Sequence, residues 1–482
     1  MSRYSFFILG LVSAALLLVS VTVPAATLTV KTDGTGNHKT VQAALDAAAE
    51  GDTILVSGGS YNEDINIGHL NMPPQKKNNI TLKAADGEKV EVALTNTSNR
   101  TASLAAAGAD FGPVDHLGFL INSDGAVVEG IRFVQNIREV NALNINVAIM
   151  IVSSNVTIRK CEFVGPGVDA SGDVVGMVVT PLDVVSLSQK IPALATNLSV
   201  ENCTITSFPY AFANHNFPLE LGMDVPSPEA TVRNCELTGN GNGIEIDDGT
   251  THVIDCRIHD NLGSGLHISD DTTIVSGCVI ENNAQNGFDI DNQELEPDEA
   301  QGIPAVTVEN CIVAGNGKTP DQRGIRLKCG SLKMTGTVVR GSGGPNLYFD
   351  TQVNREISAV IDHCDFYQSA AGIGIATTND PKTYMNIQIT NSIVTDQNGI
   401  INDAATVADF SVDYCDIFAS GTQFGGDFLS RTNDLNVDPQ YVDPANGNFY
   451  LKATSTLAKA GKNGTYLGSK GIAVGVTDWM IR

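Results

Sequence analysis

A short phrase built around a cysteine recurs along this chain and constrains its fold more than any other feature. The phrase reads Val-Arg-Asn-Cys-Glu-Leu at Cys235, and related phrases surround Cys256, Cys278 and Cys311. Each is followed by a second phrase that begins at a glycine, as in Gly243-Ile-Glu-Ile-Asp. Apolar and polar residues alternate in both phrases, which is the period of a half-buried β-strand.

The spacing of the cysteines predicts a solenoid. Cys235 and Cys256 are 21 residues apart, and Cys256 and Cys278 are 22 apart. Such a period indicates copies that cannot bury their apolar faces alone and must stack on one another. The predicted rungs are marked by Ile131, Cys161, Cys203, Cys235, Cys256, Cys278, Cys311, Thr337, Cys364, Ser392 and Cys415.

The amino terminus predicts export. Arg3 precedes an apolar run from Phe6 to Val23, and the small residues Ala25 and Ala26 follow, so residues 1–26 read as a secretory signal peptide. No later run is long and apolar enough to span a bilayer. We therefore expect a secreted protein, extracellular or periplasmic, with no membrane span.

The segment after the signal predicts an end cap for the solenoid. Residues 28–67 read as strand, helix, strand, in which Thr40 caps a helix that is ended by Gly51. A single amphipathic helix is suited to closing a stacked core. Further strands are expected at 80–83 and 127–133. The chain divides into the signal peptide, a cap with the first rungs (27–126), the β-helix (127–420) and a tail that packs on it (421–482).

The charge of the chain limits its partners. It has 54 Asp and Glu against 29 Lys and Arg, a formal net charge of -25. Nucleic acid and anionic membrane surfaces would be repelled. A polyanionic substrate would need a local basic patch or a bridging cation, and some of the acidic residues could be calcium ligands. We expect a monomer that binds no nucleic acid.

The cysteines are predicted to be buried thiols that act as small hydrophobes. Eight of them share one position of the repeat, at residues 161, 203, 235, 256, 278, 311, 364 and 415. Adjacent rungs are about 4.8 Å apart, so a disulfide between neighbours is not excluded by distance. None of the cysteines has the paired spacing of a zinc site.

Asparagines and insertions mark the corners of the rungs. Four asparagines follow their cysteines by five residues and predict a structural ladder at one corner, at Asn240, Asn261, Asn283 and Asn316. Four insertions share another corner and can wall a groove, at residues 180–196, 214–229, 292–304 and 377–385. A further insertion, Lys318 to Gln322, lies at a different corner.

These features resemble the right-handed parallel β-helix of the pectate-lyase-like superfamily. The resemblance rests on the Asn-Cys-x-Ile phrases, the asparagine ladder and the rung of roughly 22 residues, and it covers most of residues 28–450. Residues 33–45 are similar to the cap of that superfamily, and the tail at Asp438–Pro444, with Gly447 and Phe449, resembles one of secreted β-helix proteins. The fold so implied is all-β and carries many different reactions.

On stacked rungs, equivalent residues form columns. If the alternate apolar residues face the core, one outward column consists of Glu245, His267, Asp289, Arg326 and Tyr348. The neighbouring column consists of Asp247, Ser269, Asp291, Lys328 and Asp350. The adjacent turns add Asp248, Asp270 and Asp271.

Stacked like charges repel, and a bound cation would reverse this. The cluster could supply calcium with oxygen ligands from Glu245, Asp247, Asp248, Asp270, Asp271, Asp289 and Asp291. The alternative is a solvated acidic face with no ion. The same surface resembles that of the calcium-dependent family nine polysaccharide lyases, in which an Asp-rich strand holds calcium and a lysine on a following rung is the base. Arg326 occupies that lysine's position here, and Lys328 follows one outward position later.

The candidate roles follow from lyase chemistry on a uronic acid polymer, in which a cation neutralises the sugar carboxylate and a base removes the neighbouring proton. Lys328 or Arg326 is the predicted base, and arginine is better suited to binding the carboxylate. His267 could be an acid or base or a passive surface residue. Tyr348 could donate a proton or stack on a sugar, and Asp350 is a further substrate-binding candidate.

Three functions remain open from the sequence. The leading one is a calcium-dependent polysaccharide lyase that cleaves an acidic glycan by β-elimination. The second is a glycoside hydrolase that uses paired carboxylates, or an epimerase. The third is a surface protein that binds glycan or forms a stalk without catalysis.

Overall fold

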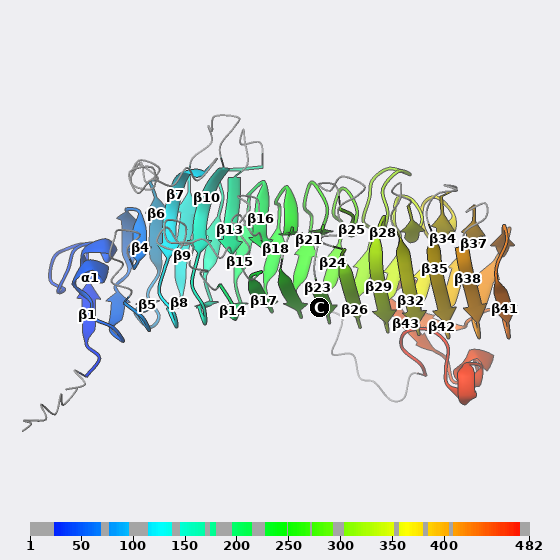
Figure 1. The fold of residues 1–482 in the computed structure, drawn as a ribbon. Helices are drawn as coiled ribbons and strands as arrows, with labels where there is room; N and C mark the ends of the chain where they lie inside the picture. The colour runs from blue at the N-terminus through cyan, green and yellow to red at the C-terminus, as the bar shows by residue number, and fades with distance from the viewer. Residues whose placement is uncertain are drawn as a thin grey trace, which may run out of the picture.

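The computed structural model describes residues 24–68, 77–95, 114–136, 145–168, 174–179, 195–214, 227–247, 249–269, 272–292, 303–350, 356–378, 384–403 and 408–472. Three long parallel sheets run side by side along the molecule, and the chain visits them in turn (Figure 1). This is an all-β parallel β-helix with a short helix near its amino-terminal end, as the repeat predicts.

Sheet A has fifteen strands, which are β1 (Thr27–Val30), β2 (Thr53–Val56), β5 (Thr81–Ala84), β8 (Val127–Glu129), β11 (Thr157–Arg159), β14 (Leu198–Glu201), β17 (Glu229–Arg233), β20 (Thr250–Ile254), β23 (Thr272–Ser276), β26 (Ala305–Glu309), β29 (Gly330–Thr335), β32 (Ile357–Asp362), β35 (Met385–Thr390), β38 (Ala408–Asp413) and β41 (Ser430–Thr432).

Sheet B has thirteen strands, which are β3 (Gly59–Asn62), β6 (Val90–Leu94), β9 (Ile131–Gln135), β12 (Glu162–Val164), β15 (Thr204–Thr206), β18 (Glu236–Thr238), β21 (Arg257–His259), β24 (Val279–Glu281), β27 (Ile312–Ala314), β30 (Val338–Arg340), β33 (Asp365–Tyr367), β36 (Ile393–Asp396) and β39 (Asp416–Ala419).

Sheet C also has thirteen, which are β4 (Ile65–Ile67), β7 (Val114–Ile121), β10 (Ile145–Ile151), β13 (Val174–Val179), β16 (Tyr210–Asn214), β19 (Asn242–Ile246), β22 (Leu266–Ile268), β25 (Phe288–Ile290), β28 (Ile325–Leu327), β31 (Leu347–Phe349), β34 (Ile373–Thr377), β37 (Asn398–Asn402) and β40 (Phe424–Gly425).

Each cysteine phrase spans two strands and not one. The residue before the cysteine adopts a left-handed conformation, with φ of 50° at Asn234 and 53° at Asp255, and turns the chain from sheet A into sheet B. The predicted single strand at 127–133 is wrong for the same reason, because Gly130 has φ of 74° and separates β8 from β9. A rung therefore contains three strands, which the alternating pattern alone does not reveal.

The amino-terminal helix closes the apolar core, as predicted. Helix α1 (Val41–Ala47) begins at Thr40, whose side chain accepts a hydrogen bond from the backbone N–H of Ala43. Its apolar face buries Val41 and Ala44 against the first strands. The helix ends at Ala47, before the predicted stop at Gly51, and among the described residues no helix is long and apolar enough to cross a membrane.

The cysteines form the predicted column of thiols. All nine cysteines are buried and free. In the column, sulfur atoms accept from the backbone of neighbouring rungs, as where the N–H of Cys235 donates to Sγ of Cys256 at 3.5 Å. Thr337 and Ser392 continue this column with hydroxyl groups. Hydroxyl and thiol can alternate here because both accept the backbone N–H of the preceding rung.

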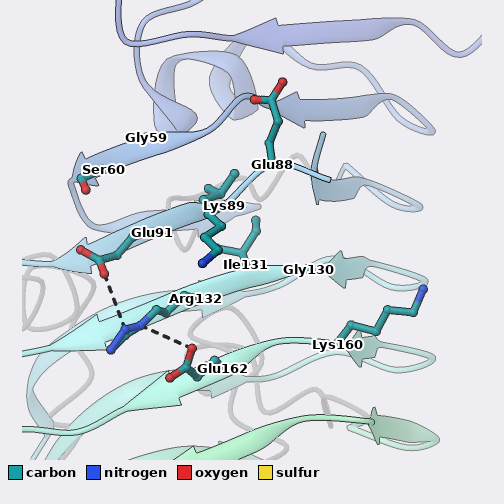
Figure 2. A pocket seen from close by; sticks show the side chains of 11 residues that line it. Gly59, Ser60, Glu88, Lys89, Glu91, Gly130, Ile131, Arg132, Lys160 and Glu162 are labelled. Carbon is teal, nitrogen blue, oxygen red and sulfur yellow. Dashed lines mark ion pairs between the residues drawn. The ribbon is translucent and has the colours of Figure 1, made fainter. Parts of the chain in front are cut away.

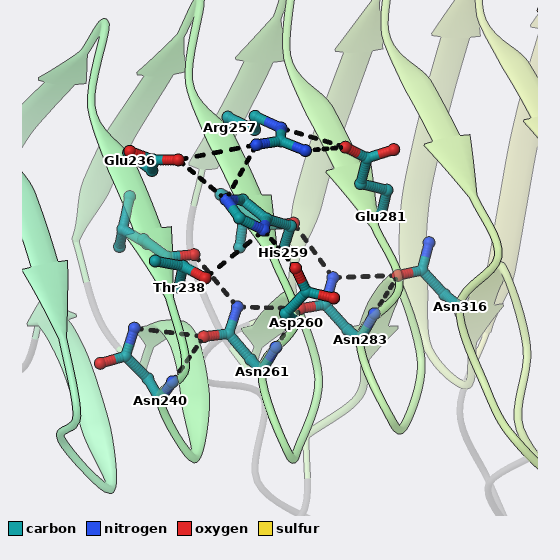
Figure 3. Close-up of polar contacts among 12 residues, drawn as sticks. Glu236, Thr238, Asn240, Arg257, His259, Asp260, Asn261, Glu281, Asn283 and Asn316 are labelled. Carbon is teal, nitrogen blue, oxygen red and sulfur yellow. Dashed lines mark hydrogen bonds and ion pairs between the residues drawn. The ribbon is translucent and has the colours of Figure 1, made fainter. Parts of the chain in front are cut away.

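The asparagine ladder is also confirmed (Figure 3). The side-chain oxygen of Asn261 accepts from the backbone and side-chain nitrogens of Asn240, and its Nδ2 donates to Asn283 at 2.8 Å. Asn316 continues the series. The left-handed conformation that asparagine tolerates occurs at neighbouring residues such as Asn282, with φ of 57°, and not in the ladder.

The carboxyl-terminal segment folds back onto sheet B. Strands β42 (Tyr441–Asp443) and β43 (Asn448–Leu451) form an antiparallel pair, accompanied by the 3₁₀ turns η1 (Pro444–Asn446), η2 (Thr456–Lys459) and η3 (Lys462–Gly464). Tyr441, Phe449 and Leu451 pack against Val338 and Ile393 of the sheet. The last solenoid strand, β41, ends at Thr432.

Candidate functional site

The first predicted column lies in register on sheet C. Parallel pairing aligns Glu245 with His267, His267 with Asp289, Asp289 with Arg326, and Arg326 with Tyr348. The apolar residues that alternate with them are fully buried in the core, namely Ile244, Leu266, Phe288, Ile325 and Leu347. The column therefore lies on the outer face of the sheet.

The residues of the second column lie just past the ends of the sheet C strands and continue the backbone hydrogen bonding between rungs. The backbone N–H of Asp291 donates to the carbonyl of Ile268, and that of Lys328 to the carbonyl of Ile290. Asp350 repeats this contact one rung later, with the carbonyl of Leu327. Asp291 and Lys328 are thus placed on adjacent rungs beside the first column.

His267 contacts two other predicted residues, one through each ring nitrogen. Its Nδ1 is hydrogen-bonded to Oε1 of Glu245, and its Nε2 lies 2.9 Å from Oδ1 of Asp291. Burial alone would lower the pKa of His267, but the hydrogen bonds to Asp291 and Glu245 outweigh it and raise the pKa to about 11. The imidazole is therefore protonated near neutral pH and is poorly suited to act as a base.

Lys328 and Arg326 neutralise the other carboxylates. Nζ of Lys328 donates to Oδ2 of Asp291 at 2.8 Å. The guanidinium of Arg326 donates to Asp289 twice, from Nε to Oδ1 at 2.8 Å and from Nη2 to Oδ2 at 2.9 Å. Three cationic groups thus interleave with the carboxylates, which relieves the repulsion that suggested a bound cation from the sequence.

Two asparagines that were not predicted from the sequence hold carboxylates of the first column by hydrogen bonds. Asn242 donates from Nδ2 to Oε2 of Glu245 at 3.1 Å, and Asn286 donates from Nδ2 to Oδ2 of Asp289 at 3.0 Å. In both rungs the asparagine stands three residues before the carboxylate, in Asn-Gly-x-Glu and Asn-Gly-x-Asp. This repeated spacing is the sequence feature from which the two asparagines could have been predicted.

Arg323 is a further residue that the sequence did not single out. Its guanidinium carbon lies 4.3 Å from the centre of the Tyr348 ring, and its backbone N–H donates to Asn286. It directly follows the insertion at Lys318 to Gln322. Burial, and then the charge of Asp350, raise the pKa of Tyr348, so its hydroxyl stays protonated.

Among the described residues, the ion pairs on sheet C have both side chains at most 21% exposed, whereas each ion pair elsewhere has one side chain at least 36% exposed. The side chain of Asp291 is 0% exposed and those of Glu245 and His267 are 15% and 18% exposed. On sheet B, Arg132 lies between Glu91 and Glu162, with exposures of 37% to 48%. Burying charge is costly unless the groups are paired, and such groups cluster at functional sites.

Glu245 carries the clearest electrostatic signature among the predicted metal ligands. Burial raises its pKa, while His267 opposes the shift. Glu245 nevertheless remains the hydrogen-bond partner of the protonated His267. Asp247, two residues later, lies close enough that its charge adds to the rise.

Three of the predicted calcium ligands already have nitrogen donors as partners. Both oxygens of Glu245, Asp289 and Asp291 accept hydrogen bonds from nitrogen donors, and calcium would have to displace these donors to gain its six to eight oxygen ligands. Asp247, a fourth predicted ligand, lies in the described part of the chain directly after β19. The other three, Asp248, Asp270 and Asp271, lie outside the described residues. Calcium dependence stays a prediction.

The four insertions fall at one corner, between a strand of sheet C and the next strand of sheet A. Most of their residues lie outside the described part of the chain, as do residues 1–23 of the predicted signal peptide. The groove that the insertions were predicted to wall is therefore untested.

A hollow of about 620 Å³ lies elsewhere, on sheet B near the amino-terminal end (Figure 2). Arg132 forms ion pairs with Glu91 and Glu162 among the lining residues, which also include Lys89 and Lys160. None of the predicted site residues lines it. Its charged groups form exposed ion pairs, so we place the candidate site on sheet C and not in this hollow.

By its fold the protein is a right-handed parallel β-helix protein. The largely buried ion pairs of its first column form a polar site on sheet C. A family model of the right-handed β-helix region matches residues 193–326, which include the column from Glu245 to Arg326. Comparison with curated proteins gave no significant match.

Several solved structures are similar to this chain at low identity. Pectate lyase Pel9A is 13% identical, with a TM-score of 0.34 over 94% of this chain and 96% of that one. The A-module of an Azotobacter vinelandii mannuronan C-5 epimerase is 13% identical, with a TM-score of 0.43 over 83% and 92%. An α-1,3-glucanase of Streptomyces thermodiastaticus is 15% identical, with a TM-score of 0.46 over 83% and 66%. This likeness concerns the fold alone.

Proposed function

We propose that the protein is a polysaccharide lyase that cleaves an acidic glycan by β-elimination on sheet C. The observation that carries this proposal is the cationic end of the column, where Arg326 and Lys328 occupy successive outward positions of one rung beside Tyr348 of the next. A chain with a net charge of -25 needs such a local patch to bind a polyanion.

In this proposal Arg326 and Lys328 bind the uronate carboxylate. Nε and Nη2 of Arg326 donate to Asp289, and Nζ of Lys328 donates to Asp291. An ammonium group has three N–H donors, so Lys328 has further donors for an anion. Neutralising the carboxylate makes the neighbouring carbon-bound proton more acidic, which β-elimination requires. The phenol of Tyr348, which stays protonated, donates to the leaving oxygen.

Lys328 is also the residue we propose as the base. An ammonium group that neutralises the carboxylate cannot accept the proton as well, so the two roles of Lys328 are alternatives, and one substitution distinguishes them. Lys328→Arg keeps a cation for the carboxylate but replaces the amine with a group that is not deprotonated in proteins. If Lys328 only binds, Lys328→Arg retains most of the activity that Lys328→Ala loses. If Lys328 removes the proton, both variants are inactive.

The test of the reaction is an assay on a panel of pectate, alginate and other uronates. A lyase raises the ultraviolet absorbance as the unsaturated product forms, and Arg326→Ala should remove most of this rate while the circular dichroism spectrum stays native. Repeating the assay with a chelator tests the predicted calcium dependence. No absorbance change on any uronate would overturn the lyase proposal.

A glycoside hydrolase is the second candidate, and Glu245 favours it. A buried carboxyl group with a raised pKa beside a second carboxylate, Asp247, is the pairing that acid and base catalysis of glycoside hydrolysis needs. New reducing ends without absorbance would indicate this reaction. Binding to a glycan with neither product would indicate a non-catalytic glycan-binding protein.

A further inference from the structure

Glu245, Asp247 and His267 bring one potential metal ligand each within 4.8 Å of one another. Glu245 and His267 are paired across strands β19 and β22, and Asp247 follows β19 directly. We propose that these three residues bind a divalent transition-metal ion of the zinc type, and that the ion this surface accepts is not calcium.

The ligand types argue for this class of ion. Imidazole nitrogen together with carboxylate oxygen suits zinc and its neighbours among the transition metals, whereas calcium takes oxygen ligands in larger number. His267 is central to the group because it contacts Glu245 directly through Nδ1. A hard cation at this position would face nitrogen where it needs oxygen.

The contact between His267 and Glu245 shows where the ion would sit. Nδ1 of His267 and Oε1 of Glu245 share a proton in a direct hydrogen bond. Zinc binds neutral imidazole and ionised carboxylate, so binding would replace this proton and release it to solvent. The ion would then lie between the same two side chains, with Asp247 as the third ligand.

The other side of the imidazole is already arranged as in a metal site. Nε2 of His267 lies 2.9 Å from Oδ1 of Asp291, a carboxylate outside the three-residue group that is fully buried. Lys328 donates to the second oxygen of Asp291 at 2.8 Å. Histidine ligands of metals nearly always donate their second N–H to a carboxylate, a carbonyl or water, which fixes the ring and strengthens the ligand.

Glu245 is also oriented by a hydrogen bond to a residue outside the three-residue group. Asn242 holds its second oxygen at 3.1 Å, which turns the first oxygen toward His267. The side chains of Glu245 and His267 are largely buried, so they have already lost most of their water. Both ligands are thus oriented by residues outside the group before any ion arrives.

Sheet B offers a matched control. His259 also contacts carboxylates through both ring nitrogens, with Nε2 lying 3.0 Å from Glu236 and Nδ1 lying 2.7 Å from Asp260 (Figure 3). These carboxylates occupy opposite sides of the ring, so they cannot meet at one ion. In the described part of the chain, the group at Glu245, Asp247 and His267 is the one whose ligand atoms all converge.

The experiment is calorimetric titration of the metal-stripped full-length protein with Zn²⁺, with Ca²⁺ titrated in parallel. We expect one equivalent of Zn²⁺ to bind, with little heat from Ca²⁺. Asp247→Asn and His267→Gln should each weaken Zn²⁺ binding at least tenfold, and Asp291→Asn should weaken it by about 10-fold to 100-fold, the usual range for such outer partners. His259→Gln should leave it unchanged.

Equal Zn²⁺ affinity in the wild type and in Asp247→Asn would overturn the proposal, as would tighter binding of Ca²⁺ than of Zn²⁺. If His267→Gln does not fold, the comparison rests on Asp247→Asn. Asp247 lies past the end of strand β19, so we expect this variant to fold. Substituting Co²⁺ gives a second readout, since its visible spectrum reports nitrogen and oxygen ligands directly. None of these measurements uses a glycan, so the outcome is independent of the proposed reaction.

Discussion

Arg326 holds Asp289 with two parallel hydrogen bonds across adjacent rungs, from Nε to Oδ1 and from Nη2 to Oδ2. Two-point pairing of this kind fixes orientation as well as charge. The column that looked like an excess of acid in the sequence is therefore a set of ordered ion pairs, and the orientation of Arg326 depends on its carboxylate partner.

Replacing Arg326 by lysine tests whether this geometry matters beyond the charge. Lysine supplies one point contact, so we expect Arg326→Lys to cost roughly 1 to 2 kcal/mol of stability and to reduce kcat/KM on the acidic glycan at least tenfold. Urea unfolding and initial rates measure the two effects. The control is Arg257→Lys on sheet B, whose exposed ion pairs should cost less than about 1 kcal/mol. Equal losses of stability in both variants would contradict the special role of the pair on sheet C.

Tyr348→Phe tests the proton-donor role of the phenol. The ring beneath Arg323 is retained and only the hydroxyl is lost. We therefore expect kcat to fall about 10²-fold to 10⁴-fold with KM nearly unchanged, in line with the usual contribution of general acid catalysis. Tyr348→Ala should also raise KM, because it removes the ring. A Tyr348→Phe enzyme with wild-type kcat would exclude the hydroxyl from the chemistry.

The sequence predicts the columns well because stacking leaves little freedom. Once Ile244 and Leu266 face the core, Glu245 and His267 must face outward, and the parallel register aligns them. The three-strand rung was not predictable from alternation alone, because the left-handed residue at Asn234 bends the chain without changing the apolar pattern. A single turn residue thus hides a strand boundary.

The pairing within the site was less predictable than its location. Sequence places Asp291 and Lys328 on neighbouring rungs, but it does not show that a buried carboxylate accepts from both Lys328 and His267. These contacts depend on side-chain rotamers and on burial by other segments. For this reason the ion pairs of this surface could not be predicted from the sequence, which pointed to a bound cation as the means of offsetting the acidic charge.

The asparagine ladder should contribute strongly to stability. Asn261 is buried and bonds the rungs on both sides of it, through Asn240 and Asn283. Asn261→Ala would leave buried backbone and side-chain groups without partners, so we expect a loss of roughly 2 to 4 kcal/mol. Thermal or urea unfolding measures it, with Asn446→Ala, an exposed residue of the tail, as the control. A change within about 0.5 kcal/mol would mean that the ladder is incidental to the fold.

Asp365 should make attachment of the tail depend on pH. This fully buried carboxyl group on β33 accepts hydrogen bonds from the backbone and hydroxyl of Ser469 at 2.7 and 2.6 Å, and from the hydroxyl of Tyr441. Burial raises its pKa to about 6, although these hydrogen bonds and Lys470 oppose the rise. The folded state therefore binds a proton more tightly than the unfolded chain, in which the ordinary pKa is about 3.9.

The sign of the effect follows from this difference. The stability that protonated Asp365 provides is complete below about pH 4 and is lost as pH rises through about 6, a change of roughly 3 kcal/mol. In Asp365→Asn the amide can accept from Ser469 and donate to Tyr441 at every pH, so this loss should be absent. Urea unfolding at several values between about pH 4 and 8 measures both proteins, and their difference isolates Asp365 from Asp416 and Asp434, whose pKa values are also raised by burial. Parallel pH profiles for the two proteins would show that Asp365 does not titrate in this range.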